Sequence, residues 1–239
     1  MKILIIVAHP DDEILGMGGT IRKLTRDKHN VKVIFMATGI KSRRSPDYKN
    51  NPDYSSNENL QKLMKKQIIQ LKKDAIKANK LLGVKDVEFI DFPDNEMDLV
   101  SQLEITKTIE KIISKFNPDT VYTHLQHDIN IDHRIIYKSV ITATRPIINS
   151  KIKKVFSFEI PSSSEWYFPS NFSPNTFVDI SNELKIKLKA MACYKNELRD
   201  FPHPRSLEAL EAIAKRWGSV SGFFAAEAFI LVRELVKKI

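Results

Sequence analysis

Residues 3–13, Ile3-Leu4-Ile5-Ile6-Val7-Ala8-His9-Pro10-Asp11-Asp12-Glu13, establish the architecture that we expect for the whole chain. They begin as a short apolar run rich in β-branched residues, which is typical of a strand buried on both faces. The run ends at a histidine, a proline and two adjacent carboxylates, and a glycine-rich segment then opens a predicted helix. Open α/β sheets bind ligands at the carboxyl ends of their strands. We therefore expect a functional site directly after this first strand.

Segments typical of strands alternate with amphipathic helical segments over residues 1–160. The predicted strands are 3–8, 31–37, 87–90, 120–123 and 155–160. The predicted helices are 12–27, 58–82 with Gly83 as its C-cap, 101–116 with Ser101 and Glu104 in capping-box spacing, and a segment ending near 144. This alternation indicates an α/β fold with a mostly parallel sheet and helices on both faces.

Residues 161–239 are less regular. They predict a short strand over 177–180, a helix over 181–198, and a helix from Ser206 that Gly218 stops. The apolar segment 223–232 fits a strand or a helix, because periodicity alone does not separate the two. We expect a single domain over 1–239, in which residues 161–239 complete the domain and its substrate cleft.

Composition limits the classes of partner. The formal net charge is +9, but the basic residues are spread through the predicted helices, so they form a solvated surface or steer a phosphorylated or nucleotide-linked substrate. No nucleic-acid motif accompanies this charge, and no apolar run is long enough to span a membrane. The single cysteine, Cys193, excludes an internal disulfide. We expect a cytoplasmic protein without nucleic-acid partners. A homo-oligomer is compatible with this composition.

Four histidines, His9, His124, His127 and His133, follow the ends of predicted strands. These ends share one edge of a parallel sheet, so residues distant in sequence can meet there. Together with Asp12, His9 and His133 would supply two imidazoles and one carboxylate. Three protein ligands with an open position are typical of catalytic zinc, although Fe²⁺, Mn²⁺ or Co²⁺ also accept this set.

Asp11 has a separate chemical use beside the ligating Asp12. A metal-bound water still needs a base to take its proton, and the neighbouring carboxylate can reach it without binding the metal. Asp128 or Asp132 could orient an imidazole through its second nitrogen. The structural alternative is that the His-Pro-Asp-Asp segment forms only a turn and a helix N-cap.

The sequence resembles the PIG-L/LmbE-like family of metal-dependent N-acetylglucosamine deacetylases. The blocks that carry this resemblance run nearly from end to end: Ala8-His9-Pro10-Asp11-Asp12-Glu13 with the glycines up to Thr20, Phe92-Pro93-Asp94-Asn95, Asp128-Ile129-Asn130-Ile131-Asp132-His133-Arg134, Arg145-Pro146, Pro161-Ser162-Ser163-Ser164-Glu165-Trp166, Pro202-His203-Pro204-Arg205-Ser206 and Ala226-Glu227-Ala228-Phe229.

The resemblance implies a Rossmann-like fold and a zinc ion held by His9, Asp12 and His133. It implies Asp11 as the general base for attack of a zinc-bound water on an N-acetyl group. The implied substrate is an N-acetylated amino sugar, such as a GlcNAc-type glycoside, a glycolipid precursor or a nucleotide-linked sugar.

One position departs from the family pattern. Many members carry a histidine where this chain has Asn130, and that histidine stabilises the oxyanion or protonates the leaving amine. An asparagine can donate a hydrogen bond to an oxyanion but cannot serve as an acid. His124, His127 or His203 could supply the proton, with His124 slightly favoured, while Asp132 stays the orienting carboxylate.

Several polar and aromatic residues are candidates for sugar binding, because an indole stacks on a pyranose and arginine suits phosphate or hydroxyl groups. These candidates are Arg43, Arg44, Asp94, Asn95, Glu165, Trp166, His203 and Arg205. Two alternatives to an N-acetyl sugar deacetylase are a metal-dependent hydrolase of another amide or ester bond and a non-catalytic sugar-binding module.

Overall fold

The computed structural model describes all residues except 39, 41–57, 149, 170–171 and 237–239. Its centre is a seven-stranded sheet with the order β3-β2-β1-β4-β5-β7-β6. The strands are β1 (Lys2–Val7), β2 (Asn30–Phe35), β3 (Asp86–Phe89), β4 (Thr120–His124), β5 (Lys154–Phe158), β6 (Thr176–Asp179) and β7 (Ala226–Glu234). The first five pair in parallel, whereas β7 pairs antiparallel with both β5 and β6. The predicted α/β class with a mostly parallel sheet is confirmed.

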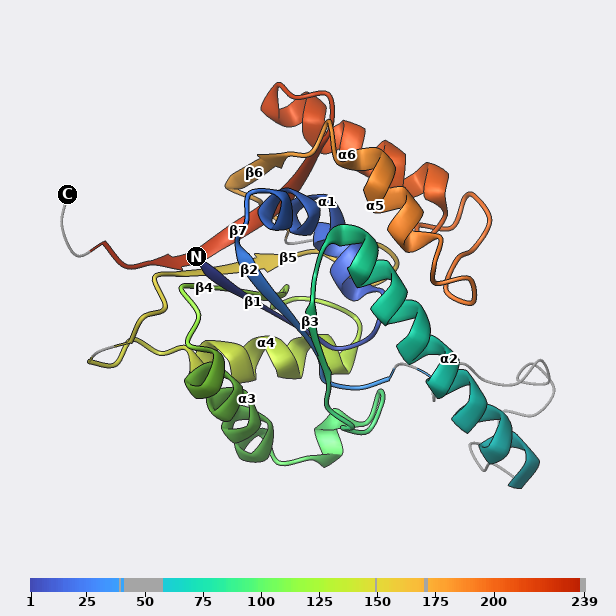
Figure 1. Ribbon diagram of the computed structural model, residues 1–239, viewed down its shortest axis with the longest axis vertical. Helices are drawn as coiled ribbons and strands as arrows, with labels where there is room; N and C mark the ends of the chain where they lie inside the picture. Colours follow the sequence, from blue (N-terminus) through green and yellow to red (C-terminus); the bar gives the residue numbers. More distant parts are fainter. Residues whose placement is uncertain (39, 41–57, 149, 170–171, 237–239) are drawn as a thin grey trace.

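Helices cover both faces of the sheet (Figure 1). They are α1 (Asp12–Arg26), α2 (Glu58–Leu82), α3 (Gln102–Phe116), α4 (Ile131–Ala143), α5 (Leu184–Met191) and α6 (Leu207–Ser221). Side chains of β1 alternate between the two cores: Ile5 packs with α1, α2 and α5, and Ile6 packs with α3 and α4. Burial on both faces explains why β1 is an uninterrupted apolar run.

The order of the strands places the site. Strand β1 lies between β2 and β4, so the chain reverses its winding direction between β1 and β4. This is the topological switch point, where open α/β sheets form a crevice at the carboxyl ends of the strands. His9 follows β1, and the segment after His124 follows β4. The two polar segments therefore meet at this crevice.

Two glycines of α1 let the helix approach its neighbours closely. A Cβ on Gly16 would lie 2.1 Å from the Phe158 ring, and one on Gly19 would lie 2.8 Å from Ile180. The helix is also interrupted at Met17, whose backbone is not helical.

A buried ion pair completes the hydrogen bonds that this interruption breaks. Glu227 accepts hydrogen bonds from the backbone N–H groups of Gly19 (2.9 Å) and Thr20 (2.6 Å). Lys187 Nζ lies 2.6 Å from the Glu227 carboxylate and also donates to the carbonyl oxygen of Leu15. This pair therefore joins α1, α5 and β7.

Three expectations for local structure were wrong. The predicted helix 181–198 is shorter, because α5 ends at Met191 and turns follow. Gly218 does not stop a helix: α6 continues to Ser221, and Gly222 ends it with a φ of 78°. Ser101 precedes α3, but its side chain makes no capping hydrogen bond. For the segment 223–232, which the sequence left open between strand and helix, the structure shows the strand β7 from Ala226 onward.

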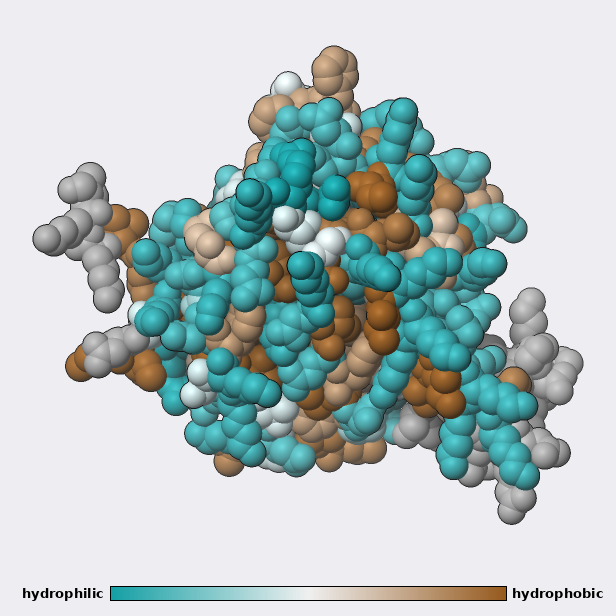
Figure 2. Space-filling view, viewed as in Figure 1, coloured by the Kyte–Doolittle hydropathy of each residue, from teal (hydrophilic) through white to brown (hydrophobic). Residues whose placement is uncertain are grey.

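Hydrophilic side chains cover most of the face seen in Figure 2, with small apolar areas between them. Within the described residues, no helix is both long enough and apolar enough to cross a membrane.

Candidate active site

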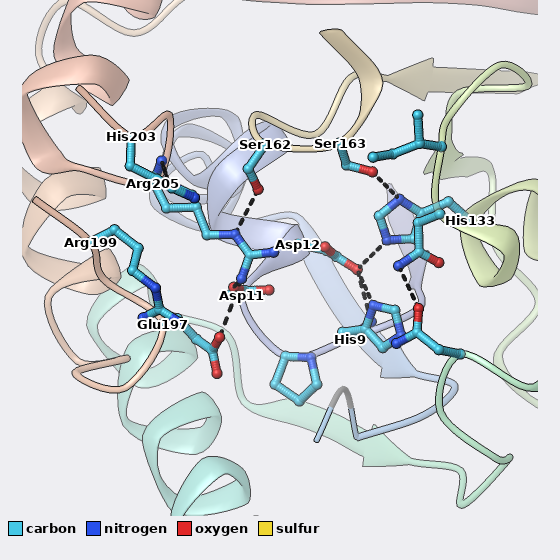
Figure 3. A pocket seen from close by; sticks show the side chains of 14 residues that line it. His9, Asp11, Asp12, His133, Ser162, Ser163, Glu197, Arg199, His203 and Arg205 are labelled. Atoms are coloured by element: carbon cyan, nitrogen blue, oxygen red, sulfur yellow. Dashed lines mark hydrogen bonds and ion pairs between the residues drawn. The ribbon is translucent and has the colours of Figure 1, made fainter. Parts of the chain in front are cut away.

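A cavity of about 520 Å³ lies at the carboxyl edge of the sheet, beside the ends of β1 and β4 (Figure 3). Its walls from the first half of the chain include His9, Asp11, Asp12, Asn95, Asn130 and His133. Its walls from the second half include Ser162, Ser163, Glu197, Arg199, His203 and Arg205. Both halves of the chain thus form this cavity.

Two imidazoles and one carboxylate converge at the base of the cavity. His9 lies just after β1, Asp12 begins α1, and His133 lies in the first turn of α4. Asp12 Oδ2 is 3.5 Å from His9 Nδ1 and 3.4 Å from His133 Nε2. Each of the three residues has a ligand atom within 4.8 Å of those of the other two. The three residues expected from their placement at strand ends therefore lie together.

The second nitrogen of each imidazole is held by carboxylates. His9 Nε2 lies 3.0 Å from Asp132 Oδ2 and 3.1 Å from Asp94 Oδ1. His133 Nδ1 lies 3.1 Å from Asp128 Oδ2. Such contacts orient metal-binding histidines and raise their basicity. Asp132 thus orients His9 rather than its sequence neighbour His133, which Asp128 orients instead.

Hydrogen bonds in turn anchor these orienting carboxylates. Ser163 and Ser164 donate their hydroxyls to Asp128, the latter at 2.7 Å. Asp132 accepts from the backbone N–H groups of Asn95 (2.7 Å) and Met97 (3.2 Å). The imidazoles therefore have little freedom to rotate.

The buried charges favour a cation between the three candidate ligands. Burial acts to lower the pKa of His133, but the Asp12 and Asp128 carboxylates outweigh it and raise that pKa to about 9. Burial acts to raise the pKa of Asp12, but His133 and His9 bring it well below its usual range. A divalent ion supplies the same positive charge that these carboxylates stabilise.

The donor set itself fits a metal. His133 Nε2 is buried and makes no hydrogen bond to the described residues; its contact with Asp12 Oδ2, at 3.4 Å, is longer than a normal hydrogen bond. A buried imidazole nitrogen without a hydrogen bond is costly unless something binds it. Two neutral imidazoles and a carboxylate suit zinc, and several other divalent transition metals as well.

Asp11 lies on the cavity wall beside this cluster (Figure 3). Its Oδ2 is 3.2 Å from Arg205 Nη1, and the same guanidinium lies 3.2 Å from Glu197 Oε2. Arg205 Nε also donates to Ser162 Oγ at 2.7 Å. The Asp11 backbone has a φ of 117°, a conformation that costs a residue other than glycine about 1–3 kcal/mol. Asp11 is thus held in a strained position at the cavity.

Asn130, the residue before α4, both caps that helix and lines the cavity. Asn130 Oδ1 accepts the backbone N–H of Asp132 at 2.9 Å, which caps α4. Its Nδ2 donates to Asn95 Oδ1 at 3.1 Å, and both side chains line the cavity. The Asn130 Nδ2 amide carries two hydrogens, so one N–H remains for a second hydrogen bond.

The three histidines considered as proton donors differ in position. His124 is fully buried behind His133, with ring centroids 4.0 Å apart, and its Nε2 accepts the backbone N–H of Ala8. Burial and the neighbouring His133 keep the pKa of His124 well below its usual range. His127 lies against the Tyr167 ring. Of these three, His203 lines the cavity.

The sugar-binding candidates are only partly in the cavity. Asn95, His203 and Arg205 line it. Asp94 is buried and tied to His9, which makes it part of the histidine-orienting layer.

The other candidates lie elsewhere. Glu165 accepts the backbone N–H groups of Ser162 and Ser163. Trp166 is 43% exposed, and its ring centroid lies 6.0 Å from that of His203. Arg43 and Arg44 lie outside the described residues.

Sequence reasoning missed other cavity residues, among them Ser162, Ser163, Glu197 and Arg199. The two serines lie inside a block that carries the family resemblance, which was a usable signal. Glu197 lies in the segment 181–198, which we predicted as one continuous helix, and Arg199 follows directly after it; that error concealed the turn that carries both. Had the helix continued to residue 198, its successive side chains would have pointed in different directions, and nothing would have indicated that Glu197 faces a cavity.

Comparisons with known proteins identify the family of the chain. Residues 4–144 match the family described as "PIG-L: GlcNAc-PI de-N-acetylase". The chain is 29% identical over 238 residues to "Diacetylchitobiose deacetylase" of Thermococcus kodakarensis, covering 97% of this chain and 83% of the relative. It is 26% identical over 196 residues to "Probable N-acetyl-alpha-D-glucosaminyl L-malate deacetylase 2" of Bacillus cereus, covering 82% and 83%.

A solved structure supports the fold. The structure of N,N'-diacetylchitobiose deacetylase from Pyrococcus horikoshii superposes with a TM-score of 0.73 at 24% identity, covering 97% of this chain and 84% of that one. The family match spans more than half of the chain, and the named relatives are deacetylases. The chain therefore belongs to the PIG-L family of de-N-acetylases and is a hydrolase of the N-deacetylase type.

Proposed function

We propose that this protein is a zinc-dependent deacetylase that removes the N-acetyl group from an N-acetylated amino sugar. The observation that carries the proposal is the convergence of His9, Asp12 and His133 beside the carboxylate of Asp11. When bound there, zinc acts as a Lewis acid and lowers the pKa of water from ~15.7 to about 7.

The side chains of the cavity have distinct roles in this proposal. Asp11 takes the proton of the attacking water, because its carboxylate faces the cavity without belonging to the ligand set. Arg205 holds that carboxylate in place through its 3.2 Å contact. The Nδ2 group of Asn130 donates a hydrogen bond to the oxygen that develops negative charge on the acetyl group. His203 can protonate the leaving nitrogen, since it lines the same cavity.

His124 has a supporting role in this proposal. Its ring stacks on His133 with an interplanar angle of 5°, and burial keeps its pKa low. A neutral ring behind a metal ligand fixes that ligand's plane without adding repulsive charge.

The substrate we propose is a GlcNAc-type glycoside, a glycolipid precursor or a nucleotide-linked sugar. The named relatives act on N-acetyl sugars, which supports the sugar part of the proposal. Arg199 and Arg205 give one cavity wall hydrogen-bond donors for hydroxyl or phosphate groups, and Trp166 lies exposed beside His203.

The proposal is tested by measuring acetate release from a panel of N-acetyl sugars. The panel contains N-acetylglucosamine, diacetylchitobiose, N-acetylglucosaminyl malate, N-acetylglucosamine 6-phosphate and a nucleotide-linked N-acetylglucosamine. We expect at least one compound to release acetate, a chelator to stop the release, and added zinc to restore it. Absence of acetate release from every compound with zinc-loaded protein would contradict the proposed function, and release that persists after chelation would contradict its metal dependence.

A further inference from the structure

A buried hydrogen-bonded cluster lies beneath Asp11, outside the cavity. Its members are Glu13 of α1, Asn79 of α2 and Tyr194 from the turn after α5. All three side chains are 0% exposed, so none of them can contact a substrate. The roles proposed above for the cavity residues do not use this cluster.

The two carboxyl oxygens of Glu13 have different partners. Its Oε1 accepts hydrogen bonds from Tyr194 Oη at 2.6 Å and from Asn79 Nδ2 at 2.9 Å. Its Oε2 accepts the backbone N–H of Asp11 at 3.1 Å. One oxygen thus anchors the carboxylate to α2 and the turn after α5, while the other holds the main chain of Asp11.

Asp11 needs such support because its backbone is strained. Its φ is 117° and its ψ is −28°, in the left-handed half of conformational space that L-residues rarely adopt. On the carbonyl side, the Asp11 oxygen accepts the N–H groups of Ile14 (3.0 Å) and Leu15 (2.9 Å). On the amide side, Glu13 holds it. Strained residues persist only where their surroundings determine them.

We propose that Glu13, fixed by Asn79 and Tyr194, is a positioning residue that holds the strained backbone of Asp11 and thereby aims its carboxylate into the cavity. The inference rests on the proposed role of Asp11 as general base. A cluster that only joined α1 to α2 would not need a carboxylate oxygen aimed at the Asp11 amide. The second oxygen is what separates positioning from simple packing.

Two substitutions test the proposal. Glu13→Gln keeps the size of the side chain but replaces one carboxyl oxygen by an NH₂ donor, so either the Asp11 amide or the Asn79–Tyr194 pair faces a donor in place of that oxygen. Tyr194→Phe removes one anchoring hydrogen bond and should disturb folding less. Tyr122→Phe is the matched control, because this buried tyrosine stacks on Phe156 in the same core.

The kinetic readout separates positioning from binding. We expect kcat for acetate release to fall about 100-fold in Glu13→Gln and about tenfold in Tyr194→Phe, since small misplacements of a catalytic group have effects of this size. KM and bound zinc per chain should stay within about twofold of the wild-type values, as should all parameters of Tyr122→Phe. Unchanged kcat in both cluster variants would overturn the proposal.

Crystal structures of the two variants give a second readout that does not depend on turnover. In Glu13→Gln, the Asp11 φ should leave the region near 117° and its carboxylate should withdraw from the cavity. An Asp11 that keeps its conformation in both variants overturns the proposal, even if kcat falls. If wild-type protein releases no acetate, the proposed function fails, and the conformation of Asp11 still decides whether Glu13 positions it.

Discussion

Removing the carboxylate of Asp128 should weaken metal binding, although Asp128 is not itself one of the three candidate ligands. Asp128 is fully buried, lies 3.1 Å from His133 Nδ1, and is fixed by the hydroxyls of Ser163 and Ser164. Asp128→Asn retains a hydrogen-bond acceptor but removes the charge, whereas Asp128→Ala removes both. Loss of such a partner typically reduces metal affinity about 10–100-fold.

The two substitutions should therefore form a graded series. We expect zinc affinity to fall about tenfold in Asp128→Asn and about 100-fold in Asp128→Ala, which correspond to about 1.4 and 2.7 kcal/mol. The assay is a zinc titration of chelator-treated protein in competition with a chromogenic chelator. Asp98→Asn, at an exposed carboxylate in η2 (Met97–Leu99), is the matched control. Wild-type affinity in both Asp128 variants would refute the reasoning that this carboxylate sets the basicity and orientation of His133.

Three further predictions concern turnover and stability. Asp11→Asn should retain zinc but lower kcat at least about 100-fold, because an amide cannot accept the proton; an active variant in the acetate assay would remove Asp11 from its role. Lys187→Met should lower the free energy of unfolding by about 3 kcal/mol, because it leaves Glu227 buried without its cation; urea denaturation measures this, and a change below about 1 kcal/mol would contradict it. Burial raises the pKa of Glu159 to about 7, although its hydrogen bond from Trp217 opposes the rise. The folded state therefore binds this proton more tightly than the unfolded state, so the stabilisation is present below the ordinary pKa of 4.5 and is lost as the pH rises through about 7. Glu159→Gln should gain stability relative to wild type between pH 5 and pH 8, by no more than about 3 kcal/mol for this half-buried group, and a pH-independent difference in denaturation would refute the shift.

The meeting of His9 with His133 could be predicted from the sequence, because strand ends in a parallel sheet share an edge. The partners of these imidazoles could not. Asp132 contacts His9 across 123 positions, and this depends on how far α4 stands from β1. Likewise, the Asp11–Arg205 contact joins residues 194 positions apart.

The wrong predictions for the ends of α5 and α6 have physical causes, and the first of them also concealed residues near the site. The segment after Met191 remains compatible with a helix in sequence, but the chain turns there and brings Tyr194 to Glu13. Gly218 lies inside α6, where a Cβ would approach the Phe223 carbonyl oxygen to 2.6 Å. That glycine serves a close contact with the returning chain, which helix-stop rules do not distinguish from a terminus.

The most direct test of the metal site is an anomalous-diffraction structure of the zinc-loaded protein. His9, Asp94 and Asp132 form a second group of potential ligands, which uses the opposite side of the His9 ring. Our account predicts one strong anomalous peak bonded to His9 Nδ1, Asp12 and His133 Nε2. A peak bonded to His9 Nε2, Asp94 and Asp132, with the first group empty, would contradict it.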